Sequence, residues 1–376
     1  MPLPDAEPTH HAMDTPEALL AECGLAAPLV RMQEPEAAAL VASSWGMTGS
    51  FTRFATEKDD TFLVTPDSGP RLVLKLSNPQ EPEADIELQT ELLLHVAEAD
   101  PALPVPRVVP ARGGAAWFTF VDRAGQTRIA RALTYLEGTP LDRFDTTPRE
   151  RERLGAMLGR LRHAMAGFSH PHDGRVVAWD VQHLPRLRGL VAHIDDAGRR
   201  SALDRGLDRF EALFNRIGAL PRQVVHNDCG RSNVVADRDT PGFVSGIIDF
   251  GDVVRTAVAI DVATTLLNQL SLVPADDIFT DGRDVLRGYL STAPLAEAEL
   301  AMVPHLVMGR VIARALITTW RAGMMPDNAT YILRNTHPSW HQLDWFLARG
   351  VDDVSAVFMD LADTAGTASH PPGDTP

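Results

Sequence analysis

The fold is decided by the stretch Val224-Val225-His226-Asn227-Asp228-Cys229-Gly230-Arg231-Ser232-Asn233-Val234-Val235 and by Gly246-Ile247-Ile248-Asp249-Phe250-Gly251-Asp252, which follows shortly after it. Each is an apolar run, typical of a buried strand, that delivers a carboxylate or a carboxamide at its end. Together they supply His-x-Asp, an Asn five residues after that Asp, and Asp-Phe-Gly. Transfer of a phosphoryl group from a nucleotide needs this set, because one Asp meets the attacking hydroxyl while an Asn and a second Asp hold the metal that bridges the phosphates.

We interpret the first stretch as a β-hairpin, in which Val224-Val225 and Val234-Val235 are buried strands joined by a loop. Asp228 is then the catalytic residue, which accepts or orients the hydroxyl of the acceptor. Asn233 and Asp249 are predicted to bind Mg²⁺, a hard cation that prefers oxygen ligands. The alternative is two ordinary strands that end in solvated loops, and the order and distance of the two motifs argue against it.

Three other polar residues of these stretches have two possible roles each. His226 either holds the loop by hydrogen bonds or takes a direct chemical part. Asp252 either supports the loop of Asp249 or contacts the substrate, and Arg231 either braces the loop or approaches the γ-phosphate. In each case the supporting role is the one we expect.

The composition is that of a soluble globular protein, with 44% apolar and 23% charged residues. The net charge of -15 argues against nucleic acid as a partner and is compatible with a cationic substrate. Cys23 and Cys229 form no metal or disulfide pattern, which suits a reducing cytoplasm. We expect no membrane-spanning stretch and no signal peptide in residues 1–15, and therefore a cytoplasmic protein without a membrane partner. The oligomeric state stays open.

Lysine is rare in this chain, which suggests a special role where it persists. Of 35 basic residues only Lys58 and Lys75 are lysines. Lys75 ends the apolar strand Leu72–Lys75, and we predict that it reaches the α- and β-phosphates. A helical glutamate should hold it in place; Glu87 is our choice, and Glu91, one turn further on, is the alternative. Chance survival is the alternative explanation for either lysine.

The first part of the chain predicts a small lobe built on an antiparallel sheet. We assign an extension with short helices to residues 1–40 and a nucleotide-binding lobe to residues 41–136. The turn at residues 46–51, with Gly46 and Gly49, is predicted to cover the phosphates. Backbone groups of Thr134 and Leu136 are predicted to bind a purine edge. The charged turn at residues 57–59 is either solvated or part of the site. The predicted strands are 45–54, 61–65, 71–76, 105–110, 116–121 and 129–136, and the predicted helices are 15–26, 35–43 and 81–98.

Glu137-Gly138-Thr139-Pro140 reads as a linker, and helices dominate after it. One starts at Pro148, with Thr147 as its cap. We assign residues 137–362 to a helical lobe that carries the catalytic and substrate-binding groups, and residues 363–376 to a disordered tail. The fold class is therefore α+β, with a β lobe, a linker and a mainly helical lobe. The further predicted helices are 199–217, 258–270, 278–290, 297–319 and 340–362.

With these motifs the chain resembles the aminoglycoside phosphotransferase/choline kinase family, which has the protein-kinase-like bilobal fold. The hydroxylysine-kinase-like branch is the closer match. The resemblance implies that Asp228 is catalytic, that Asn233 and Asp249 are metal ligands, and that Lys75 is the phosphate lysine. It also implies a nucleotide between the lobes and an amino-alcohol substrate against the helical lobe. Four segments carry the match to that branch: Leu74–Pro79, Leu133–Leu141, Ala178–Asp180 and Pro326–Tyr331.

The chain departs from the branch pattern in two segments, and these departures affect the prediction of the substrate but not that of the reaction. Where the branch commonly has Ser-Glu-Arg-Asp-x-Asn-Phe, this chain has Thr56-Glu57-Lys58-Asp59-Asp60-Thr61-Phe62 and lacks the Asn. The loop after Asp228, Cys-Gly-Arg-Ser, is also atypical. The branch's substrate is therefore not carried over to this chain.

The sequence thus predicts a kinase that transfers the γ-phosphate of ATP or GTP, with Mg²⁺, to a hydroxyl of a small amine-bearing molecule of the hydroxylysine, homoserine or amino-alcohol type. The alternatives are an aminoglycoside-type antibiotic phosphotransferase, a kinase-like module that binds nucleotide without catalysis, and a phosphohydrolase. The aromatic residues Trp320, Tyr331 and Trp345 either pack against the amine or belong to the core.

Overall fold

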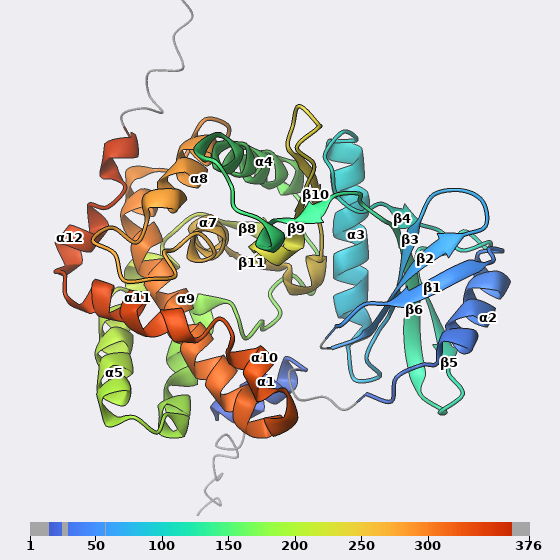
Figure 1. The fold of residues 1–376 in the computed structure, drawn as a ribbon, viewed down its shortest axis with the longest axis horizontal. Coiled ribbons are helices and arrows are strands. Elements are labelled where there is room, and N and C mark those ends of the chain that lie inside the picture. The colour runs from blue at the N-terminus through green and yellow to red at the C-terminus, as the bar shows by residue number, and fades with distance from the viewer. Residues whose placement is uncertain (1–14, 25–28, 57, 363–376) are drawn as a thin grey trace, which may run out of the picture.

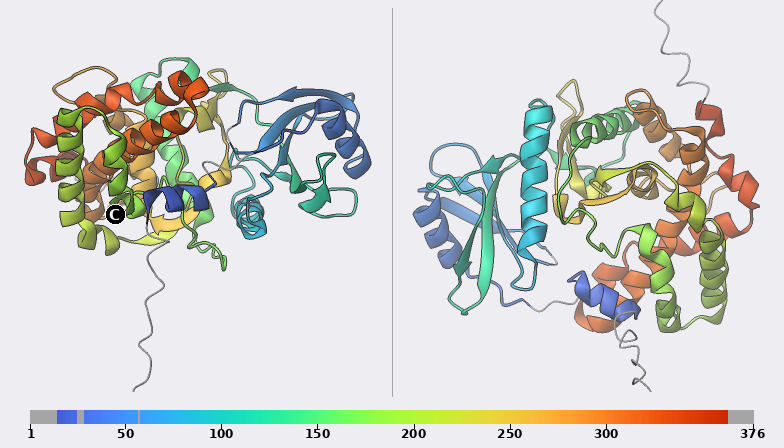
Figure 2. Two further views of the ribbon diagram at one scale, coloured as in Figure 1. Left: turned by 90° about the horizontal axis from the view of Figure 1, so that it is seen from below. Right: turned by 180° about the vertical axis from the view of Figure 1, so that it is seen from behind.

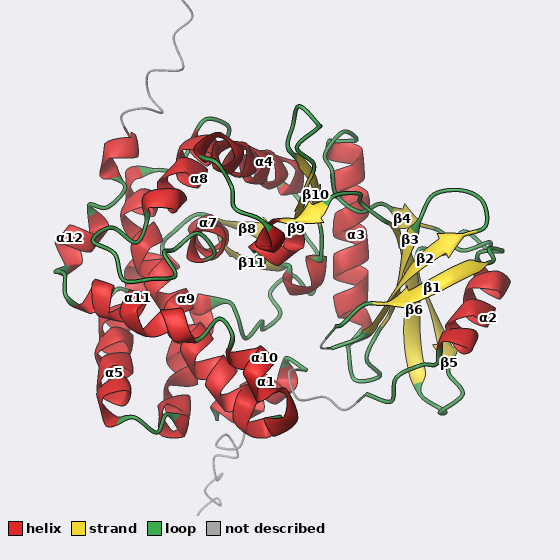
Figure 3. Ribbon diagram, viewed as in Figure 1, coloured by secondary structure: helices red, strands yellow, loops and turns green. Residues whose placement is uncertain are grey.

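The computed structural model describes residues 15–24, 29–56 and 58–362, and in this part of the chain strands and helices separate into two lobes (Figure 1). The longer strands gather in one lobe, and most of the helices form the other (Figure 3). This is the predicted α+β arrangement. The predicted disordered tail, residues 363–376, lies outside the described residues. So do residues 1–14, which make up most of the segment in which we expected no signal peptide.

The small lobe is an antiparallel sheet in the order β1-β2-β3-β6-β4, with β5 also paired to β6. Its third strand alternates: Leu72, Leu74 and Leu76 are buried against the helix α2, while Val73 and Lys75 point to the other face. The strands are β1 (Gly49–Arg53), β2 (Asp60–Pro66), β3 (Leu72–Leu76), β4 (Val108–Val109), β5 (Phe118–Val121) and β6 (Thr127–Thr134), and α2 spans Glu34–Ser44. The sheet thereby presents Lys75 on the face that looks toward the helical lobe.

Helix α3 (Glu83–Ala99) lies between this sheet and the helical lobe (Figures 1 and 2). Its buried side chains, among them Leu88, Leu92 and Val96, belong to the large core of the helical lobe rather than to the core under α2. The first helix, α1 (Pro16–Glu22), also packs there, because Leu19 and Leu20 are buried in that core. The predicted extension, residues 1–40, therefore contributes to both lobes.

The helical lobe is built around α9 (Glu297–Met324), most of whose side chains are buried. By length and composition α9 could span a membrane, contrary to our expectation that no stretch could, but 89% of its most apolar window is buried inside the protein. Helix α4 starts as predicted, with Thr147 and Glu150 in a reciprocal capping box. The other helices are α4 (Pro148–Met165), α5 (Ala197–Ala212), α6 (Phe214–Gly218), α7 (Val258–Leu267), α8 (Thr280–Leu290), α10 (Ala329–Leu333), α11 (His337–Leu347) and α12 (Val351–Ser355).

Short strands and 3₁₀ turns complete this lobe and replace the predicted hairpin. Strand β8 pairs with β11, whereas β9 pairs with β10 and β7, so the prediction that Val224-Val225 and Val234-Val235 pair with each other was wrong. The strands are β7 (Thr139–Pro140), β8 (Arg222–Val225), β9 (Val234–Ala236), β10 (Val244–Ile247) and β11 (Val254–Ala257). The 3₁₀ turns are η1 (Leu141–Arg143), η2 (Val181–His193), η3 (Arg231–Asn233), η4 (Phe250–Asp252), η5 (Pro326–Asn328) and η6 (Met359–Leu361).

Most other differences concern element ends. The helices predicted at 199–217 and 340–362 are each divided, into α5 and α6 and into α11, α12 and η6. The strand predicted at 105–110 is reduced to β4. The predictions missed the long 3₁₀ segment η2, in which Pro185 removes a backbone donor.

Candidate active site

The loop that carries Asp228 is fixed by hydrogen bonds from three directions. His226 lies wholly buried after β8; its Nδ1 accepts the Asp228 N–H (3.2 Å), so its Nε2 carries the proton and donates to the Ile248 carbonyl (3.1 Å). Burial lowers the pKa of His226, which keeps the ring neutral. Asn227 has a positive φ of 61°, and its N–H donates to the Asp261 carboxylate on α7 (2.7 Å). His226 therefore has the predicted loop-holding role.

Asp228 and Asn233 are in direct contact. The Asn233 amide nitrogen donates to the Asp228 carboxylate (2.6 Å) and to its carbonyl (2.9 Å). Burial and the nearby charge of Asp252 raise the pKa of Asp228 to about 8, and the positive charge of Arg310 opposes that rise. A carboxyl with such a pKa is suited to accepting a proton near neutral pH.

Asp249 stands beside Asn233 at the ends of paired strands, because the Ile248 N–H donates to the Asn233 carbonyl (2.8 Å). Its backbone is left-handed, with φ 62° and ψ 77°. Its carboxylate lies 3.2 Å from Lys75 Nζ, and the charge of Lys75 lowers its pKa to about 2. The structure thus brings Lys75, predicted from the small lobe, together with Asp249, predicted from the helical lobe.

The second partner of Lys75 is Asp59, whose carboxylate lies 3.5 Å from Nζ. Burial disfavours the ammonium, but Asp249 and Asp59 together hold its pKa above the usual range. Lys58, in the same turn, lies 3.8 Å from Asp252. Lys58 and Asp59 thus lie beside the predicted site residues, in line with one of the two interpretations offered by the sequence, whereas Glu57 lies outside the described residues.

The predicted ion pair between Lys75 and Glu87 is absent, and Glu91 does not replace it. Both glutamates point to the helical lobe, where each carboxylate lies 3.8 Å from His170 Nε2. Glu81, which comes before α3 begins, interacts electrostatically with Arg131 and more weakly with Lys75, and burial raises its pKa. Sequence reasoning missed Glu81 because the start of α3 relative to β3 is a tertiary feature.

Glu87, Glu91 and His170 lie close enough together to suggest a metal site, with ligand atoms within 4.8 Å of one another. The hydrogen bonding of His170 argues against it. Its Nδ1 accepts the His172 N–H (3.1 Å), so the proton is on Nε2, the atom that faces the two carboxylates. A protonated Nε2 cannot coordinate a cation, and the cluster is better described as a histidine between two glutamates.

The prediction that Gly46 and Gly49 cover the phosphates was wrong, because they lie at the opposite end of the sheet. Gly49 pairs with Pro66, whereas Lys75 pairs with Thr61, and the five residues of β1 span about 13 Å. Gly46, with φ +73°, makes room for the Arg112 guanidinium, since an added Cβ would lie 1.9 Å from its nitrogen. The connection next to Lys75 is the β1–β2 turn.

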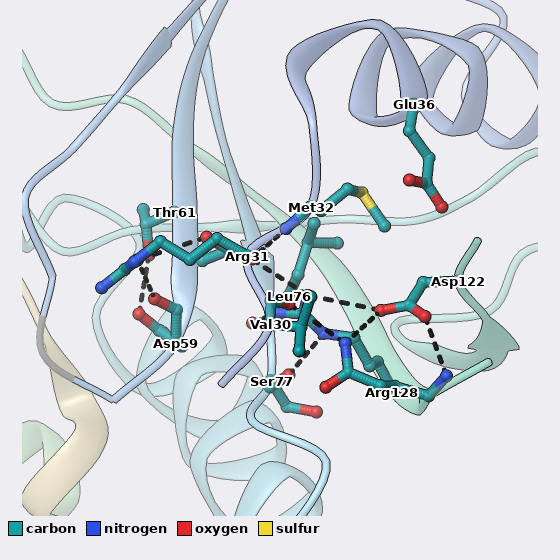
Figure 4. A network of polar contacts seen from close by, with 12 residues as sticks. Val30, Arg31, Met32, Glu36, Asp59, Thr61, Leu76, Ser77, Asp122 and Arg128 are labelled. Atoms are coloured by element: carbon teal, nitrogen blue, oxygen red, sulfur yellow. Dashed lines mark hydrogen bonds and ion pairs between the residues drawn. The ribbon is translucent and has the colours of Figure 1, made fainter. Parts of the chain in front are cut away.

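That turn is held by an arginine from the N-terminal segment (Figure 4). Arg31 donates to the carbonyls of Thr56 (2.8 Å) and Asp59 (3.2 Å). Behind it, the wholly buried Asp60 accepts from Arg128 (2.9 Å), from Arg53, and from the backbone N–H of Met32 (2.9 Å). Charged contacts rather than glycines therefore fix this turn.

Thr134 and Leu136, the two residues predicted to bind a purine edge, differ in whether their backbone groups are free to form hydrogen bonds. The Thr134 N–H and hydroxyl are bonded to the Arg107 carbonyl and N–H (both 2.9 Å). Within the described chain, the Leu136 N–H and carbonyl make no hydrogen bond, and its side chain packs on Gly246. Leu136 thus has free backbone groups for a base edge, and Thr134 is committed to the sheet.

Comparison with known proteins agrees with this geometry. Residues 50–301 match the model of the phosphotransferase enzyme family. Hydroxylysine kinase of Bos taurus is 23% identical over 88% of this chain and 93% of its own, and homoserine kinase of Rhodospirillum rubrum is 30% identical over 69% and 76%. The solved structure of a microcompartment-associated aminopropanol kinase, 22% identical, superimposes with a TM-score of 0.66 over 83% of this chain and 97% of that one. These matches confirm the predicted resemblance and the protein-kinase-like fold.

Proposed function

This chain belongs to the phosphotransferase enzyme family, and from that premise we propose that it transfers the γ-phosphoryl group of ATP or GTP to a hydroxyl of a small amine-bearing molecule of the hydroxylysine, homoserine or amino-alcohol type. The observation that carries the proposal is the contact of Lys75 with Asp249. It joins the phosphate-binding group of one lobe to the Asp228 and Asn233 pair of the other.

In the proposed reaction Asp228 receives the proton of the acceptor hydroxyl. The oxygen of that hydroxyl bonds to the γ-phosphorus, the bond to the bridging oxygen of the β-phosphate breaks, and the products are a phosphomonoester and a nucleoside diphosphate. Lys75 and the Arg31-held turn orient the phosphates from the small lobe. Positioning and charge are the main contributions a protein makes to this reaction.

The residues at the mouth of the site fit Mg²⁺. The Asn233 amide nitrogen is committed to Asp228, which leaves its carbonyl oxygen as a ligand, and the Asp249 carboxylate is half exposed. Oxygen donors of this kind suit a hard divalent cation. Asn233 and Asp249 would hold the ion, which when bound offsets the negative charge of the phosphates.

The surroundings of Asp228 favour a cationic acceptor. Four carboxylates, those of Asp180, Asp228, Asp252 and Asp261, interact with the buried guanidinium of Arg310. Those of the four carboxyl groups that are ionised attract an ammonium group. The three acceptors named for the relatives, hydroxylysine, homoserine and aminopropanol, all carry an amine.

A substrate panel tests the proposal. Release of nucleoside diphosphate and formation of a phosphorylated acceptor are measured with ATP and with GTP, using hydroxylysine, homoserine, aminopropanol, ethanolamine, choline and aminoglycosides. We expect turnover with an amino alcohol or a hydroxy amino acid. Folded protein that consumes no nucleotide with any hydroxyl acceptor would refute the proposal, and free phosphate without a phosphorylated acceptor would indicate a hydrolase.

A further inference from the structure

Arg175 connects the two lobes at the metal-binding segment. It lies between α4 and η2, and its side chain is only 8% exposed. Nη1 lies 2.7 Å from the carboxylate of Asp85, in the first turn of α3. Nε donates to the Val253 carbonyl (3.0 Å), and Nη2 donates to the Gly251 carbonyl. All three nitrogens of the guanidinium are therefore used, and only one of them by the ion pair.

The two carbonyls that Arg175 holds belong to the segment that carries Asp249. On its other side the same segment is held by His226 at the Ile248 carbonyl (3.1 Å). Asp249 itself has φ 62°, a conformation that residues other than glycine adopt only when their surroundings impose it. The hydrogen bonds from Arg175 and His226 hold the chain on either side of Asp249 and help to impose this conformation. The orientation of the Asp249 carboxylate thus depends in part on Arg175.

Arg175 is in turn oriented by α3. The Asp85 carboxylate accepts from His172 Nε2 (2.7 Å) as well as pairing with Arg175, and it is 17% exposed. Helix α3 makes no ion pair with Lys75, whose partners are Asp59 and Asp249. One contact of α3 with the site therefore runs through Asp85 and Arg175 to the metal-binding segment; another runs through Gln89 to Arg131, and neither is an ion pair with the phosphate lysine.

We propose that Asp85 and Arg175 are positioning residues that fix the Asp249 carboxylate for the metal ion and make its geometry depend on the position of α3. The proposal rests on the role of Asp249 in the proposed function. Neither residue touches the reacting atoms. The planar fork of arginine is needed because it reaches two carbonyls and a carboxylate at once, which the point charge of lysine cannot do.

The test is metal binding, measured without any acceptor. Mn²⁺ affinity in the presence of a non-hydrolysable ATP analogue is determined by electron paramagnetic resonance for the native protein, Arg175→Lys and Asp85→Asn. Partners that orient a metal ligand typically affect affinity by roughly 10- to 100-fold, and we expect a loss in that range for Arg175→Lys and a smaller one for Asp85→Asn. Metal-free nucleotide affinity should stay unchanged, and the double variant should lose less than the two single losses combined.

A matched control is available in the same part of the fold. Arg255 pairs with Asp173 (2.8 Å) and donates to the Phe168 carbonyl, but not to the segment of Asp249. Arg255→Lys and Asp173→Asn should leave Mn²⁺ affinity within about twofold of the native value. Native Mn²⁺ affinity in folded Arg175→Lys, or an equal loss in Arg255→Lys, would overturn the proposal. Because no acceptor is used, failure to find a substrate leaves this result intact.

Discussion

The two lobes supply their halves of the site in different ways. The helical lobe contributes Asp228, Asn233 and Asp249 from one short, continuous piece of chain, whose loops are fixed by bonds within that lobe. The small lobe gathers Asp59, Lys75 and Glu81 from three separate elements, and an arginine from the N-terminal segment holds the turn. A site half that is continuous in sequence can be recognised from a motif, whereas a half assembled by packing cannot.

The largest expected effect comes from the helical half. Asp228→Asn should lower kcat by roughly 10²- to 10⁴-fold, because the acceptor hydroxyl loses its proton acceptor. The isosteric amide should leave Mg²⁺-nucleotide binding in place, as titration calorimetry can verify. Asp239→Asn, in the exposed turn after β9, is the matched control and should keep native activity. Comparable activity in Asp228→Asn and Asp239→Asn would remove Asp228 from the mechanism.

In the small lobe, we expect the largest loss of stability when the buried ion pairs of Asp60, next to the β1–β2 turn, are broken. Asp60 accepts from Arg128, Arg53 and Arg31, and Asp60→Asn leaves those guanidinium groups without their carboxylate. Breaking a buried ion pair on one side costs about 3–5 kcal/mol, so we expect that loss in the free energy of unfolding by urea. Asp67→Asn, which only removes the carboxylate that accepts from the Thr48 hydroxyl, is the control. A loss below about 1 kcal/mol would show that the turn does not depend on Asp60.

Within the helical lobe, His305 should make an acid-sensitive contribution to stability because it is buried in its neutral form. His305 has no exposed surface, and burial lowers its pKa from 6.5 to about 4. Between these values the unfolded chain binds this proton and the folded chain does not, so the contribution of His305 to the free energy of unfolding falls by about 3 kcal/mol as the pH drops from 6.5 toward 4.

His305→Gln, which can still bond to Ser355, should flatten this part of the stability–pH curve, as thermal unfolding from pH 4 to 7 would show. The exposed His337, changed to Gln, is the control. An unchanged slope in His305→Gln would assign the acid sensitivity to other groups.

We expect the smallest effects from replacing the two lysines of the small lobe, which lie at different distances from the carboxylates of the site. Lys75 is 17% exposed between Asp59 and Asp249, and Lys75→Met should lower kcat/KM for the nucleotide by roughly 10- to 150-fold, the value of a charged hydrogen bond. Lys58 is 41% exposed and 3.8 Å from Asp252, so Lys58→Met should cost less than about fivefold. Steady-state kinetics with varied nucleotide measure both, and equal losses would mean that the turn and the strand share the phosphate contact.

Agreement between the sequence predictions and the structure is best where the information is local. Lys75 could be located because an apolar strand ends in a rare lysine, and the structure brings it to Asp249. Glu87 failed because the pairing depends on where α3 begins relative to β3. Gly46 and Gly49 failed because Gly46 precedes β1 and Gly49 begins it, whereas the antiparallel strand order places the β1–β2 turn beside the end of β3 that carries Lys75.

The predicted hairpin failed for a similar reason. The left-handed Asn227 and the turn η3 redirect the chain after β8, so its partner becomes β11, on the far side of the Asp-Phe-Gly motif. The Asp85–Arg175 pair joins two charges that no sequence pattern relates.

Helix α1 has a consequence for the way the lobes are joined. It is anchored on the helical lobe by Leu19 and Leu20, while Arg31 and Met32, a few residues later, are bonded to the sheet of the small lobe. The chain therefore passes from one lobe to the other between α1 and α2 as well as at the linker before β7. Truncation before residue 29 would remove the first of these connections and leave the linker before β7 and noncovalent contacts such as Asp85–Arg175 to hold the lobes together.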